Sequence, residues 1–217
     1  MRRAKGSEFR LWAGAAMLWL TVCAGAVSAA LLGLLSIDRP DKVLRSPVEI
    51  EHAFVALVAG QAFFLVFLWP LFEHPPATRA ETGGLLNAVA RLTGLLLLSA
   101  PLVLVARQTS SVGAGDVLRS QALLWVGGVA VAAALRLPGA RAWYYPAACF
   151  LSGVVPLAAY LLREEGELPA DWAAVLSPLW ATGAAAAGAT SPAALILFAT
   201  LAAGAVLLGL LVRPSRP

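Results

Sequence analysis

Long runs without a charged side chain are the feature of this sequence that most limits its fold. The first run extends over 27 residues from Leu11 to Ile37, and the second over 20 residues from Ala53 to Phe72. About 20 apolar residues in a helix cross the roughly 30 Å hydrocarbon core of a bilayer. Only 13% of the 217 residues are charged, whereas soluble domains hold about a quarter. The sequence therefore predicts an all-α, polytopic membrane protein.

Charged clusters and turn residues divide the chain into six expected transmembrane helices. They cover residues of about 11–37, 53–72, 85–106, 120–135, 142–162 and 193–212. The uncharged part of the third, Leu92–Ala106, holds only 15 residues, so we expect this helix to begin near Leu85 with Arg91 reaching toward the interface. The aromatic cluster from Trp143 to Tyr145 is typical of an interfacial belt at the start of the fifth. Residues 1–217 then form a single transmembrane domain.

The apolar stretch from Trp172 to Thr190 is interrupted by Ser177 and Pro178. As a seventh span it would leave a connection of two residues before the last helix and place eight basic residues on each side of the membrane. We therefore expect a re-entrant or interface-lying helical hairpin over residues of about 168–190 on the outer face, with a seventh span as the alternative. Irregular backbone at that depth must be covered by protein or line a cavity, so the hairpin should pack against the bundle or a second subunit.

The distribution of charge predicts how the spans are oriented. With six spans, ten Lys and Arg residues and three acidic residues lie on the side of the two termini, against six and nine on the other side. The first side includes Glu73, Arg91 and Arg136. Short loops rich in Lys and Arg stay in the cytosol, so we expect both termini to be cytosolic in a bacterial-type inner membrane. The residues before Ala29 resemble a signal peptide, but the apolar run continues to Ile37, so we expect an uncleaved first span.

Residue patterns of enzymes and cofactor-binding proteins are missing from the sequence. Neither of its two lysines follows a glycine-rich phosphate-binding loop, so we expect no ATPase site within the chain itself. His52 and His74 flank one span, about 33 Å apart at helical rise, and cannot share a haem within the chain. Cys23 and Cys149 lie within apolar runs, as small buried residues do. Because the basic residues are spread over short loops, we expect no nucleic-acid partner, and no catalytic, cofactor or metal site is expected either.

Two short patterns resemble protease signatures but lack an essential residue. After Glu164-Glu165, Pro169 occupies the position of the arginine in the EExxxR pattern of CAAX-protease-like enzymes. Ser152 lacks the first glycine of a G-x-S-G nucleophile and has no nearby base. Gln61, the most polar side chain inside a span, fits an interhelical hydrogen bond better than a substrate contact. Because no acidic residue lies at the centre of a span, transport driven by protons or sodium is poorly supported.

Three local patterns fall next to the expected spans. They are Glu8-Phe9-Arg10 in the basic N-terminal segment, Arg79-x-Glu81-x-Gly83 after the second span and Leu176-Ser177-Pro178-Leu179 before the last span. In these patterns and in its six spans, the chain resembles the membrane subunit of a type-two ABC transporter, the ABC-2-type permease family. The resemblance covers essentially the whole chain. It departs from the family in a short N-terminal segment and in a fourth span with only 14 uncharged residues, Ala122–Leu135. Gly84 also replaces the threonine of the family's R-x-E-x-G-T pattern.

The resemblance implies a permease subunit that exports or flips a substrate together with a separate ATP-binding-cassette ATPase and a second permease subunit, identical or different. The partner would hydrolyse ATP, so the chain itself is not expected to be an enzyme. The resemblance implies an ATPase-docking loop that contains Arg79, Glu81, Gly83 and Gly84. It also implies that the turn of the outer hairpin lies at Ser177 and Pro178. The alternative, which needs no motif, is a non-catalytic anchor or scaffold subunit of a larger membrane complex, for example a respiratory one.

Overall fold

The computed structural model describes residues 2–31, 52–73, 83–137, 139–164 and 177–188 and a few single positions between 196 and 207. All regular secondary structure in these residues is helical, which confirms the all-α prediction for this part of the chain. Three helices are long and apolar enough to cross a membrane, and a bent pair adds a fourth if it counts as one span. Six spans are not confirmed, and the sixth, at about 193–212, lies almost wholly outside the described residues.

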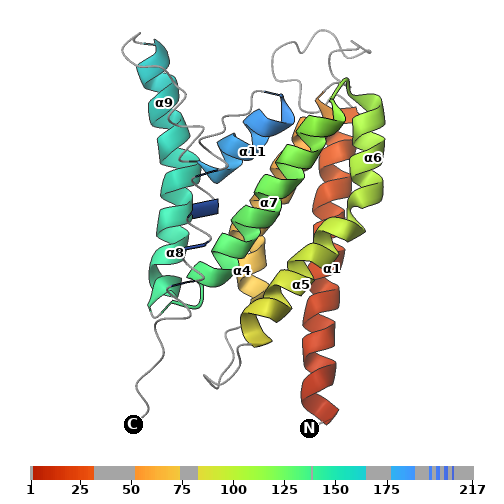
Figure 1. The fold of residues 1–217 in the computed structure, drawn as a ribbon, viewed down its shortest axis with the longest axis vertical. Coiled ribbons are helices and arrows are strands. Elements are labelled where there is room, and N and C mark those ends of the chain that lie inside the picture. The colour runs from red at the N-terminus through yellow and green to blue at the C-terminus, as the bar shows by residue number, and fades with distance from the viewer. Residues whose placement is uncertain are drawn as a thin grey trace.

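The helices run back and forth between two ends of a bundle, drawn as its lower and upper ends in Figure 1. The segments that rise from the lower end are α1 (Arg2–Leu31), α5 and α6 (Gly83–Leu98, Ala100–Thr109), and α8, η2 and α9 (Ala140–Cys149, Phe150–Val154, Val155–Glu164). The segments that return to it are α3, η1 and α4 (Ala53–Phe63, Phe64–Leu68, Trp69–Phe72) and α7 (Ala114–Ala134). The basic N-terminal residues therefore continue into the first span as one helix, and α4, α5, α7 and α8 all have one terminus at the lower end.

Small residues let these helices approach closely. A Cβ added at Gly60 on α3 would lie 3.1 Å from the Cβ of Ala26 on α1, and one added at Gly128 on α7 would lie 2.7 Å from a methyl group of Leu92 on α5. Lipid tails are as apolar as the side chains, so close packing of this kind contributes much of the attraction between helices in a membrane. Buried residues of α1, α3, α5, α6 and α7 accordingly form one continuous core.

The fourth helix is longer than the sequence predicts. It begins at Ala114 rather than near residue 120, so the predicted start of this helix was wrong. Asp116 lies in the first turn, where the helix dipole favours a carboxylate, and pairs with Arg119 over 3.4 Å. Charged residues can thus extend a membrane helix beyond its apolar part, and their use as loop markers placed the helix start too late.

The third span bends by 42° between α5 and α6. Pro101 lies at the start of α6, and because proline has no N–H group, the carbonyl of Leu97 loses its usual helical donor. The backbone still continues through the bend, since Ser99 N–H donates to Leu95 over 3.1 Å and Val103 N–H donates to Ser99 over 3.0 Å. The predicted helix over 85–106 is therefore present as two joined helices with Ser99 at the joint.

Tyr144 on α8 completes the hydrogen bonding of the second span. Pro70 has no N–H group, so the carbonyl oxygen of Val66, four residues earlier, cannot accept the usual α-helical hydrogen bond. The π-helical turn η1 precedes this proline, and the hydroxyl of Tyr144 donates to the Val66 oxygen over 2.8 Å. Within the predicted interfacial belt, Trp143 is 75% exposed, whereas Tyr144 points onto η1, which the prediction missed.

We expect Tyr144→Phe to lower the free energy of unfolding by about 1 kcal/mol, because the Val66 carbonyl, which lacks its usual α-helical donor, then also loses the tyrosine hydroxyl. Unfolding in mixed detergent micelles measures the loss. Pro70→Ala restores an N–H group, so Tyr144→Phe should cost less in a Pro70→Ala background than in the wild type. An equal cost in both backgrounds would show that Tyr144 does not act through this carbonyl.

The short helix α11 (Pro178–Ala186) lies against α3, α7 and η2 in the upper half of the bundle (Figure 1). Its nine residues are about 14 Å long at helical rise, which is less than half of a hydrocarbon core. It starts directly after the buried Ser177 and is followed by Gly188, where an added Cβ would lie 3.9 Å from Asp116 at the upper end of α7. The helix therefore begins inside the bundle and ends at its upper end. The other parts of the expected hairpin, 168–176 and 189–190, lie outside the described residues.

Candidate functional site

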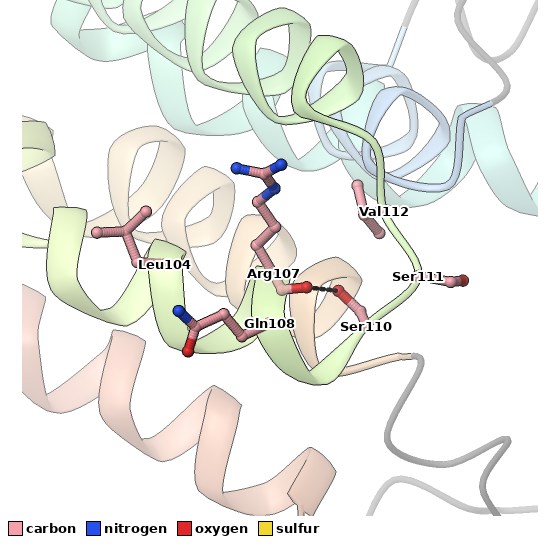
Figure 2. Close-up of a pocket in the computed structure, with 6 residues that line it drawn as sticks. All are labelled: Leu104, Arg107, Gln108, Ser110, Ser111 and Val112. Carbon is pink, nitrogen blue, oxygen red and sulfur yellow. Dashed lines mark hydrogen bonds between the residues drawn. The ribbon is translucent and has the colours of Figure 1, made fainter.

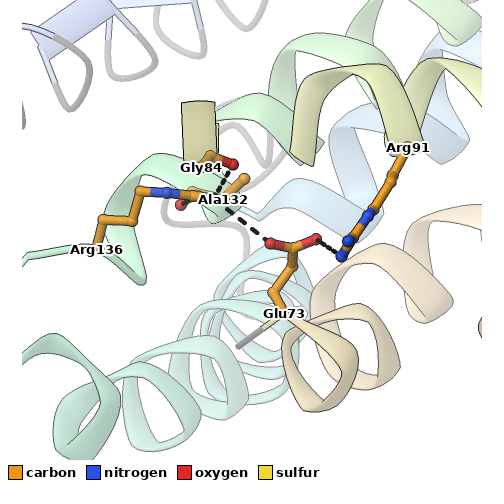
Figure 3. A network of polar contacts seen from close by, with 5 residues as sticks. All are labelled: Glu73, Gly84, Arg91, Ala132 and Arg136. Carbon is orange, nitrogen blue, oxygen red and sulfur yellow. Dashed lines mark hydrogen bonds and ion pairs between the residues drawn. The ribbon is translucent and has the colours of Figure 1, made fainter. Parts of the chain in front are cut away.

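Three charged side chains from three helical segments meet at the lower end of the bundle (Figure 3). Glu73 directly follows α4, Arg91 lies on α5, and Arg136 lies just beyond α7. Oε1 of Glu73 is 3.9 Å from Nη1 of Arg91, and its Oε2 is 3.5 Å from Nη2 of Arg136. We call Glu73, Arg91 and Arg136 the charge cluster.

Arg136 also joins two helix termini through their backbone. Its guanidinium donates to the carbonyl of Ala132 in the last turn of α7 and to the carbonyl of Gly84 in the first turn of α5. A cation is favoured near the C-terminal carbonyls of a helix, which explains an arginine directly after α7. Through Glu73 the same guanidinium reaches the end of α4, so three helix ends are held at one point.

Burial makes these contacts strong. The side chain of Glu73 is only 6% exposed, and those of Arg91 and Arg136 are 26% and 20% exposed. Burial lowers the pKa of Arg136, and Arg91 lowers it further, while the carboxylate of Glu73 acts in the opposite direction. Arginine nevertheless stays protonated in proteins, so the cluster combines two positive charges with one negative charge. A carboxylate buried to this extent needs such partners to remain ionised.

The sequence predicted part of this site. It placed Glu73, Arg91 and Arg136 on the same side of the membrane, and their contact agrees with that placement. It missed the contact itself, although an acid at the end of one apolar run and arginines at the ends of two others were a usable signal. Of the docking loop implied by the family resemblance, Arg79 and Glu81 lie outside the described residues. Gly83 and Gly84 open α5, and the Gly84 carbonyl takes part in the cluster.

A second polar group lies inside the bundle, where it joins three helices. Gln121 on α7 donates to the Gln61 side-chain oxygen over 3.0 Å, and Gln61 on α3 donates to the Ser99 hydroxyl over 2.9 Å. The hydroxyl of Ser99, at the bend between α5 and α6, donates to the carbonyl of Leu96 over 3.0 Å. This confirms the predicted interhelical hydrogen bond of Gln61. We call Gln61, Ser99 and Gln121 the polar chain.

We expect Ser99→Ala to lower the free energy of unfolding by about 1 kcal/mol, the size of an average interhelical hydrogen bond in a membrane. Gln61→Leu removes both contacts of the chain and should cost more. A double-mutant cycle between the two positions, followed by unfolding in mixed micelles, should give a coupling of about 0.5 kcal/mol or more. Additive costs would mean that the two side chains do not interact.

The charge cluster and the polar chain join the same three helical segments. Each segment contributes one residue to each group: Gln61 and Glu73 from the second span, Ser99 and Arg91 from the third, and Gln121 and Arg136 from α7. Arg91 and Ser99 are eight residues apart on one helix, or about 12 Å at helical rise. These segments are therefore tied by polar contacts at two levels of the bundle. Such an arrangement can transmit a displacement from one level of the bundle to the other.

A pocket lined partly by polar residues lies at the upper end of the bundle (Figure 2). It opens beside the connection between α6 and α7, and its lining consists of Leu104, Arg107, Gln108, Ser110, Ser111 and Val112. The Ser110 hydroxyl donates to the carbonyl of Ala106 over 2.6 Å and so caps α6. The lining holds one cation and no acid, and the described residues contain no group of three or more His, Cys, Asp or Glu that could hold a metal ion.

Comparison of the chain with protein-family models, with curated proteins and with solved structures finds no match. The function must therefore be inferred from the residues of the chain itself.

Proposed function

We propose that this chain is the membrane-spanning permease subunit of an ABC transporter, which exports or flips its substrate with a separate ATPase subunit and a second permease subunit. The observation that most supports this is the attachment of both ends of the 74–82 connection to the charge cluster. Glu73 precedes the connection, and Gly84 and Arg91 follow it. A partner that moved the connection would therefore move the lower ends of α4, α5 and α7 together.

The polar chain gives such a movement a route into the membrane. A displacement at Arg91 would pass along α5 to the bend at Ser99, where the helix is already interrupted by Pro101. There the hydrogen bonds of Gln61 and Gln121 would carry it to the second span and to α7. Proline kinks and π-helical turns are frequent where membrane helices change shape, and the second span carries one such turn in η1.

In this proposal the lower end of the bundle faces the cytosol of a cell with a bacterial-type inner membrane, and both termini are on that side. The α4–α5 connection can then meet a cytosolic ATPase, which hydrolyses ATP for the two permease subunits. The helix α11 belongs to a re-entrant hairpin on the outer face, since nine residues are too short to cross a bilayer. This matches the arrangement that the ABC-2-type resemblance implies.

We expect the charge swap Arg79→Glu/Glu81→Arg to reduce the recovery of the ATPase at least about tenfold, because like charges placed against each other at an interface disfavour binding strongly. The measurement is purification of the tagged chain from its native membranes, followed by mass spectrometry of the co-eluting chains. The swap leaves the net charge unchanged, so membrane insertion should be normal.

The matched control is the swap Asp116→Arg/Arg119→Asp, which reverses an exposed ion pair at the upper end of the bundle. It should leave the recovery of the ATPase as in the wild type. A normal amount of ATPase with the Arg79 and Glu81 swap would argue against docking at this loop. If no ATPase co-purifies with the wild-type chain, that result would argue against the proposal that the chain is a permease subunit.

A scaffold subunit of a larger membrane complex is the second candidate function. It is favoured by the many exposed apolar side chains along α8, η2 and α9, which suit a neighbouring subunit as well as lipid: Trp143, Phe150, Val154, Leu157 and Leu161. The same purification separates the two candidates, since a scaffold would elute with redox or other membrane subunits and without an ATPase.

A further inference from the structure

The charge cluster carries more positive charge than it can neutralise. Glu73 is shared by Arg91 and Arg136, and its 3.9 Å separation from Arg91 is too long for a hydrogen bond. In the part of the chain that the structure describes, the Arg91 side chain has no hydrogen-bond acceptor of its own. Among the described residues, therefore, two guanidinium groups share one carboxylate, and that of Arg91 has donors that none of these residues accepts from.

The position of the cluster decides which anion can reach it. The side chains of Arg91 and Arg136 are 26% and 20% exposed, so part of each is accessible from outside the bundle. Apolar side chains at the same end are strongly exposed, with Leu71 at 58% and Leu86 at 74%. In a membrane protein, such side chains face lipid. An arginine among them would lie at the depth of the lipid headgroups, where its guanidinium can meet their phosphate groups.

We infer that the charge cluster binds the phosphate of an anionic phospholipid, with Arg91 as the main contact. Guanidinium and phosphate form paired, charge-assisted hydrogen bonds, and basic pockets between membrane helices on the cytosolic side recognise acidic headgroups. Arg136 would add positive potential from its place against Gly84. Glu73 would then compete with the phosphate for both arginines. This inference does not depend on an ATPase partner.

Because Glu73 and the phosphate compete for the arginines, substitutions of Arg91 and of Glu73 should change lipid binding in opposite directions. Native mass spectrometry of the full chain in detergent micelles measures binding of phosphatidylglycerol, with phosphatidylcholine as the neutral lipid. Arg91→Gln should weaken binding of phosphatidylglycerol about tenfold, the effect of losing a charge-assisted contact. Glu73→Gln should strengthen it, because both arginines become available. Arg107→Gln, at the upper end of the bundle, is the matched control and should bind as the wild type does.

A purely structural role of the cluster would weaken binding in both variants, and that result would overturn the inference. Equal binding of phosphatidylglycerol and phosphatidylcholine by the wild type would also overturn it. Inorganic phosphate should not displace the lipid at millimolar concentration, and displacement would indicate a site for free phosphate instead. If Glu73→Gln cannot be purified, the comparison of Arg91→Gln with Arg107→Gln still decides the question.

Discussion

Glu73→Gln is expected to lower the free energy of unfolding by about 3 kcal/mol, the lower end of the range for breaking a buried ion pair. The change leaves two arginines close together at the lower end of the bundle without their shared carboxylate. The lower end of the range applies because both arginines are partly exposed. Unfolding of the purified chain in mixed detergent micelles measures the effect.

The exposed pair at the other end of the bundle provides the control. Asp116 and Arg119 are 3.4 Å apart, but the arginine side chain is 55% exposed. Asp116→Asn should therefore cost less than about 1 kcal/mol, as exposed ion pairs do. Adding Arg91→Gln to Glu73→Gln removes one of the uncompensated charges and should restore part of the lost stability. If Glu73→Gln proves as mild as Asp116→Asn, the charge cluster does not hold the helix ends together.

Gly128→Ala is expected to destabilise the protein by about 2 kcal/mol through overpacking. The added Cβ would lie 2.7 and 2.8 Å from the two methyl groups of Leu92, closer than real Cβ contacts come. The Leu92 side chain is fully buried, so it cannot move aside without disturbing its neighbours. The contact joins α5 and α7, the helices that carry Arg91 and Arg136. The same unfolding measurement applies.

The neighbouring glycine makes a matched control for this substitution. A Cβ at Gly127 would meet nothing within 4 Å, so Gly127→Ala should be neutral or slightly stabilising. Leu92→Ala removes the atoms that an alanine at position 128 would meet, and in that background Gly128→Ala should cost much less. A similar loss for Gly127→Ala and Gly128→Ala would mean that the cost arises from the helix backbone and not from the contact with Leu92.

The helices themselves were the part of the fold that the sequence predicted best. The second span, predicted at 53–72, coincides with the helical segment from Ala53 to Phe72. In lipid, the backbone of an uncharged run must satisfy its own hydrogen bonds, and a helix over the whole run does so. The start of α7 was missed because Asp116 and Arg119 pair on the helix surface and so do not end it. The bend at Ser99 was missed as well, although Pro101 was a visible signal for it.

Contacts between the spans were predicted less well, for a physical reason. The sequence indicated that Gln61 would bond to another helix, but many polar residues could have been its partner, and Ser99 and Gln121 were identified only by the packing. Likewise, Tyr144 was assigned to the interface by its type, whereas the carbonyl freed by Pro70 draws it inward. Side chains far apart in the sequence pair according to the depth and rotation of their helices, which a single sequence does not give.

The orientation of the charge cluster is the claim on which the proposed function depends, and impermeant thiol labelling of intact cells tests it most directly. Single cysteines are placed at Thr78, in the connection after the second span, and at Ser111, in the connection between α6 and α7. The background is Cys149→Ala, since Cys149 is exposed while Cys23 is buried. We predict labelling at position 111 from outside, and labelling at position 78 only after the membrane is permeabilised. Labelling of position 78 in intact cells would place the connection and the charge cluster on the outer side, out of reach of any cytosolic ATPase.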